Sequence, residues 1–317
     1  MINCKKVFVL HKIIGAGRCF IQKVKQNHNV SLLVKQNNNA VKKYELIDMP
    51  LPLRIDIETL NRCNGSCSFC PCNVHEVQRP YAKMTEDLFH KIINELVALN
   101  YKGSVALFDN NEPFLDERII DFQKYVKEKL PDVFCDLWCN GTVLTLDKFI
   151  QIMPYLDRLV IDNYSDDGVW HANVKKVMDY IEDKPLLKNK VVFYMRKKTE
   201  VLTSRGGSSP NKKDCKCINS TCVLPFQQLN IRPDGKISLC CNDALGKVTL
   251  GDVNIQSIEE VWNSPEYTRI RETMKKSKRK NLFLCNHCDT LGGIFDESLF
   301  FSRKEQCNKW NPIHSIN

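Results

Sequence analysis

The sequence lacks both a long apolar run and a secretory leader. No apolar segment approaches the roughly 20 residues that a membrane-spanning helix needs. The short apolar segment 7–10 is followed at once by His11 and Lys12, and no small-residue cleavage site comes after it. We therefore expect a cytoplasmic protein without a membrane partner, in a compartment where thiols stay reduced.

The sequence also lacks large clusters of charged residues of one sign. The net charge is +9, yet lysine and arginine are dispersed except for one basic run at residues 275–280. A solvated helix end accounts for that run better than a nucleic-acid-binding patch does. With 317 residues, of which 43% are hydrophobic and 26% charged, the chain can form one large domain and a smaller one.

Cysteine, by contrast, is abundant. The chain has 16 cysteines, which in a reducing compartment indicate metal binding rather than disulfides. Four stand apart from any ligand spacing, and we interpret them as small buried hydrophobic residues: Cys4, Cys19, Cys135 and Cys139. Four others are left without an assignment: Cys215, Cys217, Cys241 and Cys307.

The most informative stretch holds Cys63, Cys67 and Cys70, spaced x₃ and then x₂. A tight loop of this kind can place three thiolates on three corners of a 4Fe–4S cluster and leave the fourth iron open for another ligand. A structural zinc site with Cys72 or His75 as fourth ligand is the alternative that the triplet alone leaves open.

With Phe69, this stretch reads C-x₃-C-x-aromatic-C and resembles the signature of the radical S-adenosylmethionine (SAM) enzymes. The resemblance implies that the open iron binds the amino and carboxylate groups of SAM. It also implies that an electron from the cluster cleaves SAM into methionine and a 5′-deoxyadenosyl radical, which takes a hydrogen atom from a substrate. An electron donor such as flavodoxin or ferredoxin would be needed.

The segment from residue 53 onward alternates strands with helices, which predicts an α/β fold with a parallel sheet. The radical SAM resemblance turns this into a partial (β/α)₆ TIM-like barrel, although the sixth strand is not evident in the sequence. Before this segment, residues 36–39 indicate an exposed loop. The five predicted strands are 53–58, 104–108, 133–139, 159–162 and 191–195, with helices at 85–99, 117–130, 146–153 and 169–181.

Two motifs fall where strands end, which is where barrels of this type carry their chemistry. Residues 109–113 resemble the family's G-G-E-P segment, with asparagine in place of both glycines, so Glu112 is expected to hold the SAM ammonium group and Asn111 to lie beside it. Asparagine tolerates a positive φ better than most residues, which keeps the turn feasible.

Two further residues are expected near SAM. Asn140, in Cys-Asn-Gly-Thr, resembles the family's Thr-Asn-Gly, in which the asparagine faces SAM. Arg196, at the end of the fifth strand, either pairs with the SAM carboxylate or caps the sheet in water. Phe69 completes the expected cofactor-binding set.

A second cysteine set follows a Gly/Ser-rich stretch, residues 204–210, which reads as a linker. Gly235-x₄-Cys240 lies on a predicted hairpin (228–232 and 236–240), a helical face continues from Ile258 to Ile270, and Cys285-x₂-Cys288 closes the set. With Cys222 these residues supply four thiolates, enough to saturate a 4Fe–4S cluster. A zinc ribbon would use the same ligand count.

This pattern resembles the SPASM/Twitch domain that follows many radical SAM barrels. Because residues 289–303 contain no cysteine, the single-cluster Twitch form, a small β-hairpin and helix iron–sulfur domain, fits better than the two-cluster SPASM form. The expected domains are an extension at 1–48, the barrel at 49–205, the auxiliary-cluster domain at 206–292 and a tail at 293–317.

The resemblance implies oxidation of a polar small molecule, such as a sugar or aminocyclitol alcohol, with the second cluster accepting an electron. Polar residues expected at the mouth of the barrel would suit a polyol: Asp162, Asn163, Arg196 and Arg205. Modification of a precursor peptide by the same radical chemistry is the alternative, followed by a non-catalytic zinc protein that binds nucleic acid.

Overall fold

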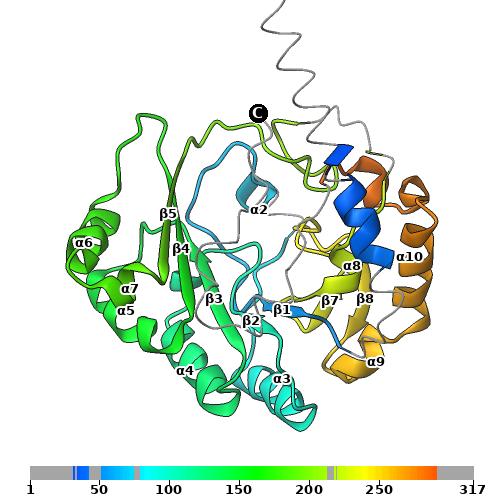
Figure 1. Ribbon diagram of the computed structural model, residues 1–317, viewed down its shortest axis with the longest axis horizontal. Coiled ribbons are helices and arrows are strands. Elements are labelled where there is room, and N and C mark those ends of the chain that lie inside the picture. The colour runs from blue at the N-terminus through cyan, green and yellow to red at the C-terminus, as the bar shows by residue number, and fades with distance from the viewer. Residues whose placement is uncertain are drawn as a thin grey trace, which may run out of the picture.

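The computed structural model describes residues 31–32, 34–42, 51–74, 79–212, 218 and 220–290. In these residues eight strands form one sheet in the order β5-β4-β3-β2-β1-β6-β7-β8. The first five strands curve around a central space, with helices α3 to α7 on their outer side (Figure 1). No helix in this part of the chain is both long enough and apolar enough to cross a membrane.

The five predicted strands are confirmed, and all pair in parallel, which is compatible with a partial TIM-like barrel. The sixth parallel strand comes from the second half of the chain: β6 (Gln228–Ile231) pairs with β1, on the side away from β5. The others are β1 Arg54–Ile57, β2 Ser104–Ala106, β3 Phe134–Cys139, β4 Arg158–Tyr164 and β5 Val191–Arg196.

Two of the helices between these strands begin at a threonine cap. Thr85 accepts a hydrogen bond from the Leu88 amide at the start of α3, and Thr145 does the same for the Lys148 amide at α5. The helical elements of this half are α2 Pro71–Val74, α3 Glu86–Ala98, η2 Pro113–Leu115, α4 Ile119–Lys129, α5 Leu146–Ile152, η3 Met153–Tyr155, α6 Ala172–Ile181 and α7 Pro185–Lys188.

Alternate residues of each strand face opposite sides of the sheet. On β1, Ile55 and Ile57 are fully buried in the apolar core, whereas Arg54 and Asp56 form a buried ion pair at 2.6 Å on the other side. Arg54 also binds Asp136 of β3 at 2.7 Å. The inner face of the curved sheet is therefore polar, and the apolar core lies between the sheet and the helices.

The second half continues this sheet. The predicted hairpin is confirmed as β6 and β7 (Lys236–Ser238), which pair antiparallel, and β8 (Thr249–Asp252) adds to β7. The single helix expected over 258–270 is two helices, because Ser264 caps a new helix that has a proline in its first turn. The helical elements are α8 Leu224–Gln227, α9 Ile258–Trp262, α10 Pro265–Lys275, η4 Arg279–Asn281 and η5 Cys285–His287.

One further expectation was wrong. Residues 34–42 are helical, so 36–39 is not an exposed loop, and Asn37 is buried one turn from Val41. Tertiary contact overrides the weak helix propensity of asparagine here. Cys135 and Cys139 are buried as expected. Cys4, Cys19, Cys215, Cys217 and Cys307 lie outside the described residues.

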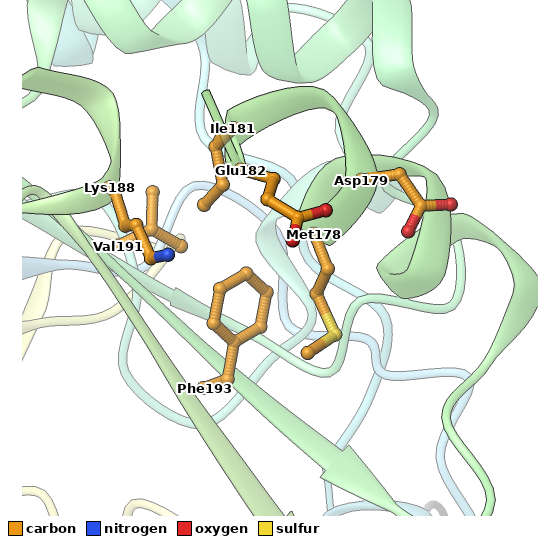
Figure 2. A pocket seen from close by; sticks show the side chains of 7 residues that line it. All are labelled: Met178, Asp179, Ile181, Glu182, Lys188, Val191 and Phe193. Atoms are coloured by element: carbon orange, nitrogen blue, oxygen red, sulfur yellow. The ribbon is translucent and has the colours of Figure 1, made fainter. Parts of the chain in front are cut away.

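A pocket of about 390 Å³ opens on the outer side of β5 (Figure 2). Its walls come from α6, α7 and the outward-facing side of β5, with Met178 and Phe193 as its apolar surface. None of its lining residues comes from a cysteine loop or from the polar inner face of the sheet, so this pocket is separate from the site described next.

Candidate active site

The first cysteine set lies in the loop that follows β1. Gly65 sits between two of its thiols: a Cβ atom built there would lie 3.3 Å from the Cys63 sulfur and 3.9 Å from the Cys67 sulfur. The Gly65 amide also donates to the Cys63 sulfur at 3.3 Å. The loop thus leaves side-chain-free space beside its thiols, which fits a cluster.

Burial and neighbouring groups shift the pKa values of these thiols. It raises the pKa of Cys63 to about 11 and that of Cys67 to about 12, and the neighbouring thiols raise both further. A hydrogen bond from Cys72 lowers the pKa of Cys70 to about 6, with Arg205 and Arg79 acting in the same direction. Thiolates gathered this closely require positive charge, which cluster iron supplies.

The two motifs at the strand ends meet at this loop. Glu112 is almost fully buried; its carboxylate accepts hydrogen bonds from the backbone amides of Asn140 at 2.7 Å and Phe114 at 3.2 Å. Burial raises the pKa of Glu112 to about 7. The Asn140 amide group donates to Asn64 in the cysteine loop at 2.9 Å and lies 3.9 Å from the Cys63 sulfur.

The other expected SAM neighbours have defined surroundings. The Asn111 side-chain oxygen accepts from the Asp109 amide at 3.1 Å, and its nitrogen is buried without a partner in the described residues. Arg196 pairs with Asp162 at 3.2 Å and Glu200 at 3.4 Å, so carboxylates already face its guanidinium. Phe69 is buried against Tyr164.

Asn163 does not belong to the mouth of the barrel. Its side chain accepts from the His171 amide at 2.8 Å and donates to the Val169 carbonyl at 3.0 Å, which holds the loop ahead of α6. The expectation that it faces a polyol was therefore wrong, because adjacent residues of a strand point to opposite faces. Asp162, its neighbour, points inward with Arg196.

The inner face of the sheet carries a set of charged and aromatic side chains, most of which the sequence analysis missed; we call this set the chamber. Its charged members include Arg79 and Glu58, which form a buried ion pair. Asp109 and Arg205 are both partly exposed, and Arg205 lies near enough to act on the pKa of Asp109. Burial, reinforced by the charges of Asp56 and Glu58, raises the pKa of Asp109 well above its usual range. The available signal was the alternation of charged residues along β1, Arg54-x-Asp56-x-Glu58.

Aromatic side chains form another wall of this chamber. Phe108 and Trp138 stack with ring centres 6.1 Å apart, and Tyr194 follows Trp138 at 6.4 Å. All three are partly exposed, and they stand at the carboxyl ends of β2, β3 and β5. A chamber with charged groups on one side and aromatic rings on the other suits a compact polar ligand.

The Gly/Ser-rich segment expected to be a linker is instead a packed part of the structure. Arg205, Gly206 and Gly207 have φ of 50°, 61° and 80° in succession. Arg205 is a long side chain in the left-handed region, which a protein retains only where surrounding contacts enforce it. Ser204 supplies such contacts, since its hydroxyl donates to the His287 carbonyl at 2.8 Å and its amide to Asp289 at 2.7 Å.

The second cysteine set comes together from distant parts of the chain. Burial raises the pKa of the Cys240 thiol, and nearby Cys241, Cys285, Cys288 and Cys222 raise it further. The charged groups that act most on Cys241 are Asp109 and Arg205. Cys222, Cys285 and Cys288 thus lie near Cys240, and the four-cysteine ligand set expected from the spacing stays a prediction.

Within the described residues, no three Cys, His, Asp or Glu side chains are placed to hold a single metal ion. His75, a candidate fourth ligand of the zinc alternative, lies outside the described residues. A cubane holds its cysteines around a larger body than one ion does. The arrangement therefore fits clusters better than the zinc alternatives.

Comparison with known proteins agrees with this site. Residues 222–289 match the SPASM family, an iron–sulfur cluster-binding domain. The chain is 25% identical over 239 residues to the S-adenosyl-L-methionine-dependent 2-deoxy-scyllo-inosamine dehydrogenase of Niallia circulans, covering 75% of this chain and 92% of that protein.

Two solved structures have a similar fold. The crystal structure of BtrN in complex with AdoMet and 2-DOIA superposes with a TM-score of 0.68 at 23% identity, covering 77% of this chain and 95% of that one. BtrN in an open conformation gives a TM-score of 0.58 at 20% identity, covering 77% and 94%. These comparisons support 4Fe–4S clusters and SAM as the cofactors of this chain. They also support a radical SAM enzyme with a SPASM/Twitch domain as the group of proteins that this chain resembles.

Proposed function

We propose that this chain is a radical SAM dehydrogenase that oxidises one alcohol of an aminocyclitol or related sugar to a ketone. The observation that carries the proposal is the group of charged and aromatic side chains on the inner face of the sheet, which lies close to both cysteine sets. Arg205 lies near Cys70 of the first set, and its partner Asn110 donates to the backbone carbonyl of Cys241, the residue after Cys240 of the second set. The named activity of the Niallia circulans relative supports the same substrate class.

The first cysteine set, Cys63, Cys67 and Cys70, would hold the SAM-binding cluster, and Cys222, Cys240, Cys285 and Cys288 the second one. When bound, the first cluster and SAM would supply a 5′-deoxyadenosyl radical that removes a hydrogen atom from the alcohol carbon. Loss of the hydroxyl proton to solvent and of one electron to the second cluster would then complete the ketone. Phe69, Asn111, Glu112 and Asn140 would surround SAM. Arg196 would instead remain paired with the carboxylates of Asp162 and Glu200.

The chamber provides the groups that bind a polyol. Among the described residues, the Asp109 carboxyl group makes no side-chain hydrogen bond or ion pair. Its raised pKa favours the neutral form, which can both donate to and accept from a substrate hydroxyl. Arg205 can donate to a substrate oxygen. Phe108 and Trp138 offer flat apolar surfaces for a ring. A carboxyl group, a guanidinium and aromatic rings fix the orientation of a compact polar ring.

The test is an anaerobic incubation of the reconstituted chain with SAM, a reductant such as reduced flavodoxin, and a panel of aminocyclitols and sugars. We expect 5′-deoxyadenosine and a product two hydrogens lighter than one of these compounds, both detected by mass spectrometry. The matched control is Cys67→Ala, which should form neither.

Two results would contradict the proposal. SAM cleavage with no oxidised polyol, but with a mass change in a precursor peptide, would favour peptide modification instead. A colourless protein that retains one zinc per chain and no iron would remove the radical chemistry altogether.

A further inference from the structure

Asn110 stands where the family's motif has a glycine, and its side chain joins the two halves of the molecule. Its amide nitrogen Nδ2 donates to the backbone carbonyl of Cys241 at 3.2 Å. Its oxygen Oδ1 accepts from Nη2 of Arg205 at 2.5 Å. Glycine has no side chain, so neither contact could exist in the family's usual sequence.

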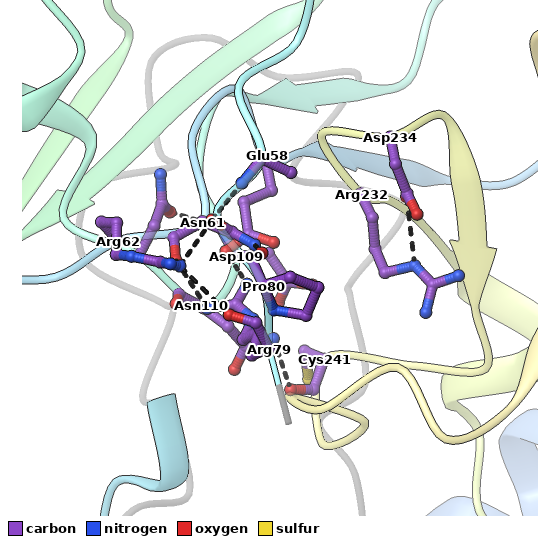
Figure 3. Close-up of polar contacts among 12 residues, drawn as sticks. Glu58, Asn61, Arg62, Arg79, Pro80, Asp109, Asn110, Arg232, Asp234 and Cys241 are labelled. Atoms are coloured by element: carbon purple, nitrogen blue, oxygen red, sulfur yellow. Dashed lines mark hydrogen bonds and ion pairs between the residues drawn. The ribbon is translucent and has the colours of Figure 1, made fainter. Parts of the chain in front are cut away.

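The backbone of Asn110 is held just as firmly. Its carbonyl accepts from Nη1 of Arg79 at 2.8 Å, and the same guanidinium pairs with Glu58 at the end of β1 (Figure 3). Asn110 is 6% exposed. Its side chain is therefore a fixed bridge from the end of β2 to the second cysteine set.

The asparagine is not there to satisfy the turn. Among the described residues, the non-glycines with positive φ are Asn100, Arg205 and Ser277, so neither Asn110 nor Asn111 needs glycine's backbone freedom. The reason expected from the sequence, tolerance of positive φ, is thus wrong. The side chain itself remains as the difference between this chain and the family's motif.

We infer that Asn110 is a positioning residue with two separable tasks. Through Arg205 it fixes a substrate-binding guanidinium in the chamber, and through the Cys241 carbonyl it fixes the loop of the ligand Cys240 against that chamber. The inference rests on the proposed function, because both tasks matter when a substrate in the chamber is oxidised and the second cysteine set receives its electron.

Two substitutions separate the tasks. Asn110→Gly restores the family's residue and removes both contacts without requiring a new backbone conformation. Asn110→Asp keeps the shape and the acceptor for Arg205, but a carboxylate cannot donate to the Cys241 carbonyl. Asn254→Ala is the matched control, since it removes an exposed asparagine side chain that also bonds a backbone carbonyl, that of Asp234, and is bonded to neither Arg205 nor Cys241.

The readouts are the KM for the substrate, the oxidised product per 5′-deoxyadenosine, the iron content, and amide hydrogen exchange in a peptide covering 236–242. In Asn110→Gly we expect KM to rise about tenfold, the scale of a lost hydrogen bond to a charged group. The product per 5′-deoxyadenosine should fall, and exchange at 236–242 should speed up with iron content unchanged.

Asn110→Asp should keep a KM within about twofold of the parent, the scale of a contact that is preserved rather than lost, yet show the same lower product ratio and faster exchange. Asn254→Ala should leave KM and the ratio unaltered. The inference is overturned if both Asn110 variants, loaded with iron, keep the parent's ratio and exchange rate. If the parent forms no oxidised product, the proposed function fails, and the hydrogen-exchange comparison alone decides the bridge.

Discussion

At the scale of single residues, Glu112 serves two partners with one carboxylate. Its oxygens accept from the amides of Asn140 and Phe114, which ties the end of β2 to the end of β3 beside the cysteine loop. Two amide donors favour the charged form, yet burial outweighs them and raises the pKa of Glu112 to about 7. A cationic ligand group nearby would lower the pKa of Glu112 and so favour its charged carboxylate form.

This balance predicts a pH-dependent affinity for SAM. If Glu112 holds the SAM ammonium group, the carboxylate form binds and the neutral form does not. Because the free carboxyl has a pKa of about 7, affinity should rise with pH through that value and be about tenfold weaker at pH 6 than at pH 8. Equilibrium dialysis of SAM over this range measures it.

The control for this prediction is Glu112→Gln, which is neutral at every pH. Its affinity for SAM should be low and nearly flat between pH 6 and pH 8. An affinity that varies equally in the variant and the parent would assign the titration to another group, and the ammonium-binding role of Glu112 would fail.

At the scale of elements, Gly206 marks where the 204–210 segment presses on the second cysteine set. Its φ is 61°, and a Cβ atom there would lie 2.5 Å from Cδ1 of Leu284. Gly168 has a similar φ of 72° but no described atom within 4 Å of a Cβ position. The two glycines therefore share a backbone requirement and differ only in packing.

Gly206→Ala should accordingly lower the free energy of unfolding more than Gly168→Ala does. Both substitutions force an alanine into the left-handed region, which costs about 1–2 kcal/mol, and the first adds about 1–3 kcal/mol of overpacking. Urea unfolding of the two variants and the parent measures the difference. Equal losses would show that the segment yields to Leu284 without cost.

The elements also show what the sequence could and could not specify. The five strands and the hairpin were predictable because buried strands and turn residues leave local signals. The pairing of β6 with β1 was not, since register between distant strands depends on tertiary packing. The 204–210 segment was misread for the same reason: glycine and serine indicate a flexible linker unless something packs on them, and Leu284 does.

The residues of the candidate site also fall into two groups: those that local sequence patterns indicate and those that only the fold brings together. The spacings of Cys63, Cys67 and Cys70 and of the second set are local patterns, so the candidate ligands could be named in advance. The chamber could not, because Glu58, Asp109 and Arg79 come from three separate segments that only the fold brings together.

A prediction at this scale concerns η5, which begins at Cys285 and is followed by its C-cap residue, Cys288. Replacing either by alanine should reduce the oxidised product far more than 5′-deoxyadenosine, because the first cysteine set is untouched. Both products are quantified by mass spectrometry in the same reaction.

Two controls accompany this experiment, because cluster-binding energy is also folding energy. Circular dichroism must show a folded variant, and substrate binding must be retained. If the two products then fall in parallel, the second cysteine set has a structural or substrate-positioning role and does not accept an electron.

At the scale of the whole molecule, one continuous sheet joins the barrel strands to the second cysteine set. β6 pairs with β1, and β7 leads from the hairpin to Cys240. The loop of the first set leaves from β1 itself, and only β6 lies between β1 and β7, so one sheet carries both sets. This common frame places both sets against one chamber without a flexible linker between them.

The two sets should therefore load independently while sharing one frame. Anaerobic reconstitution should give about eight iron and eight sulfide per chain, the content of two cubanes. The triple variant of Cys63, Cys67 and Cys70 to alanine should retain about half. Iron near twelve per chain would mean a third cluster, with ligands drawn from Cys215, Cys217, Cys241 and Cys307. A triple variant that loses all its iron would show instead that the second cluster assembles only after the first, and the independence inferred from the shared sheet would be wrong.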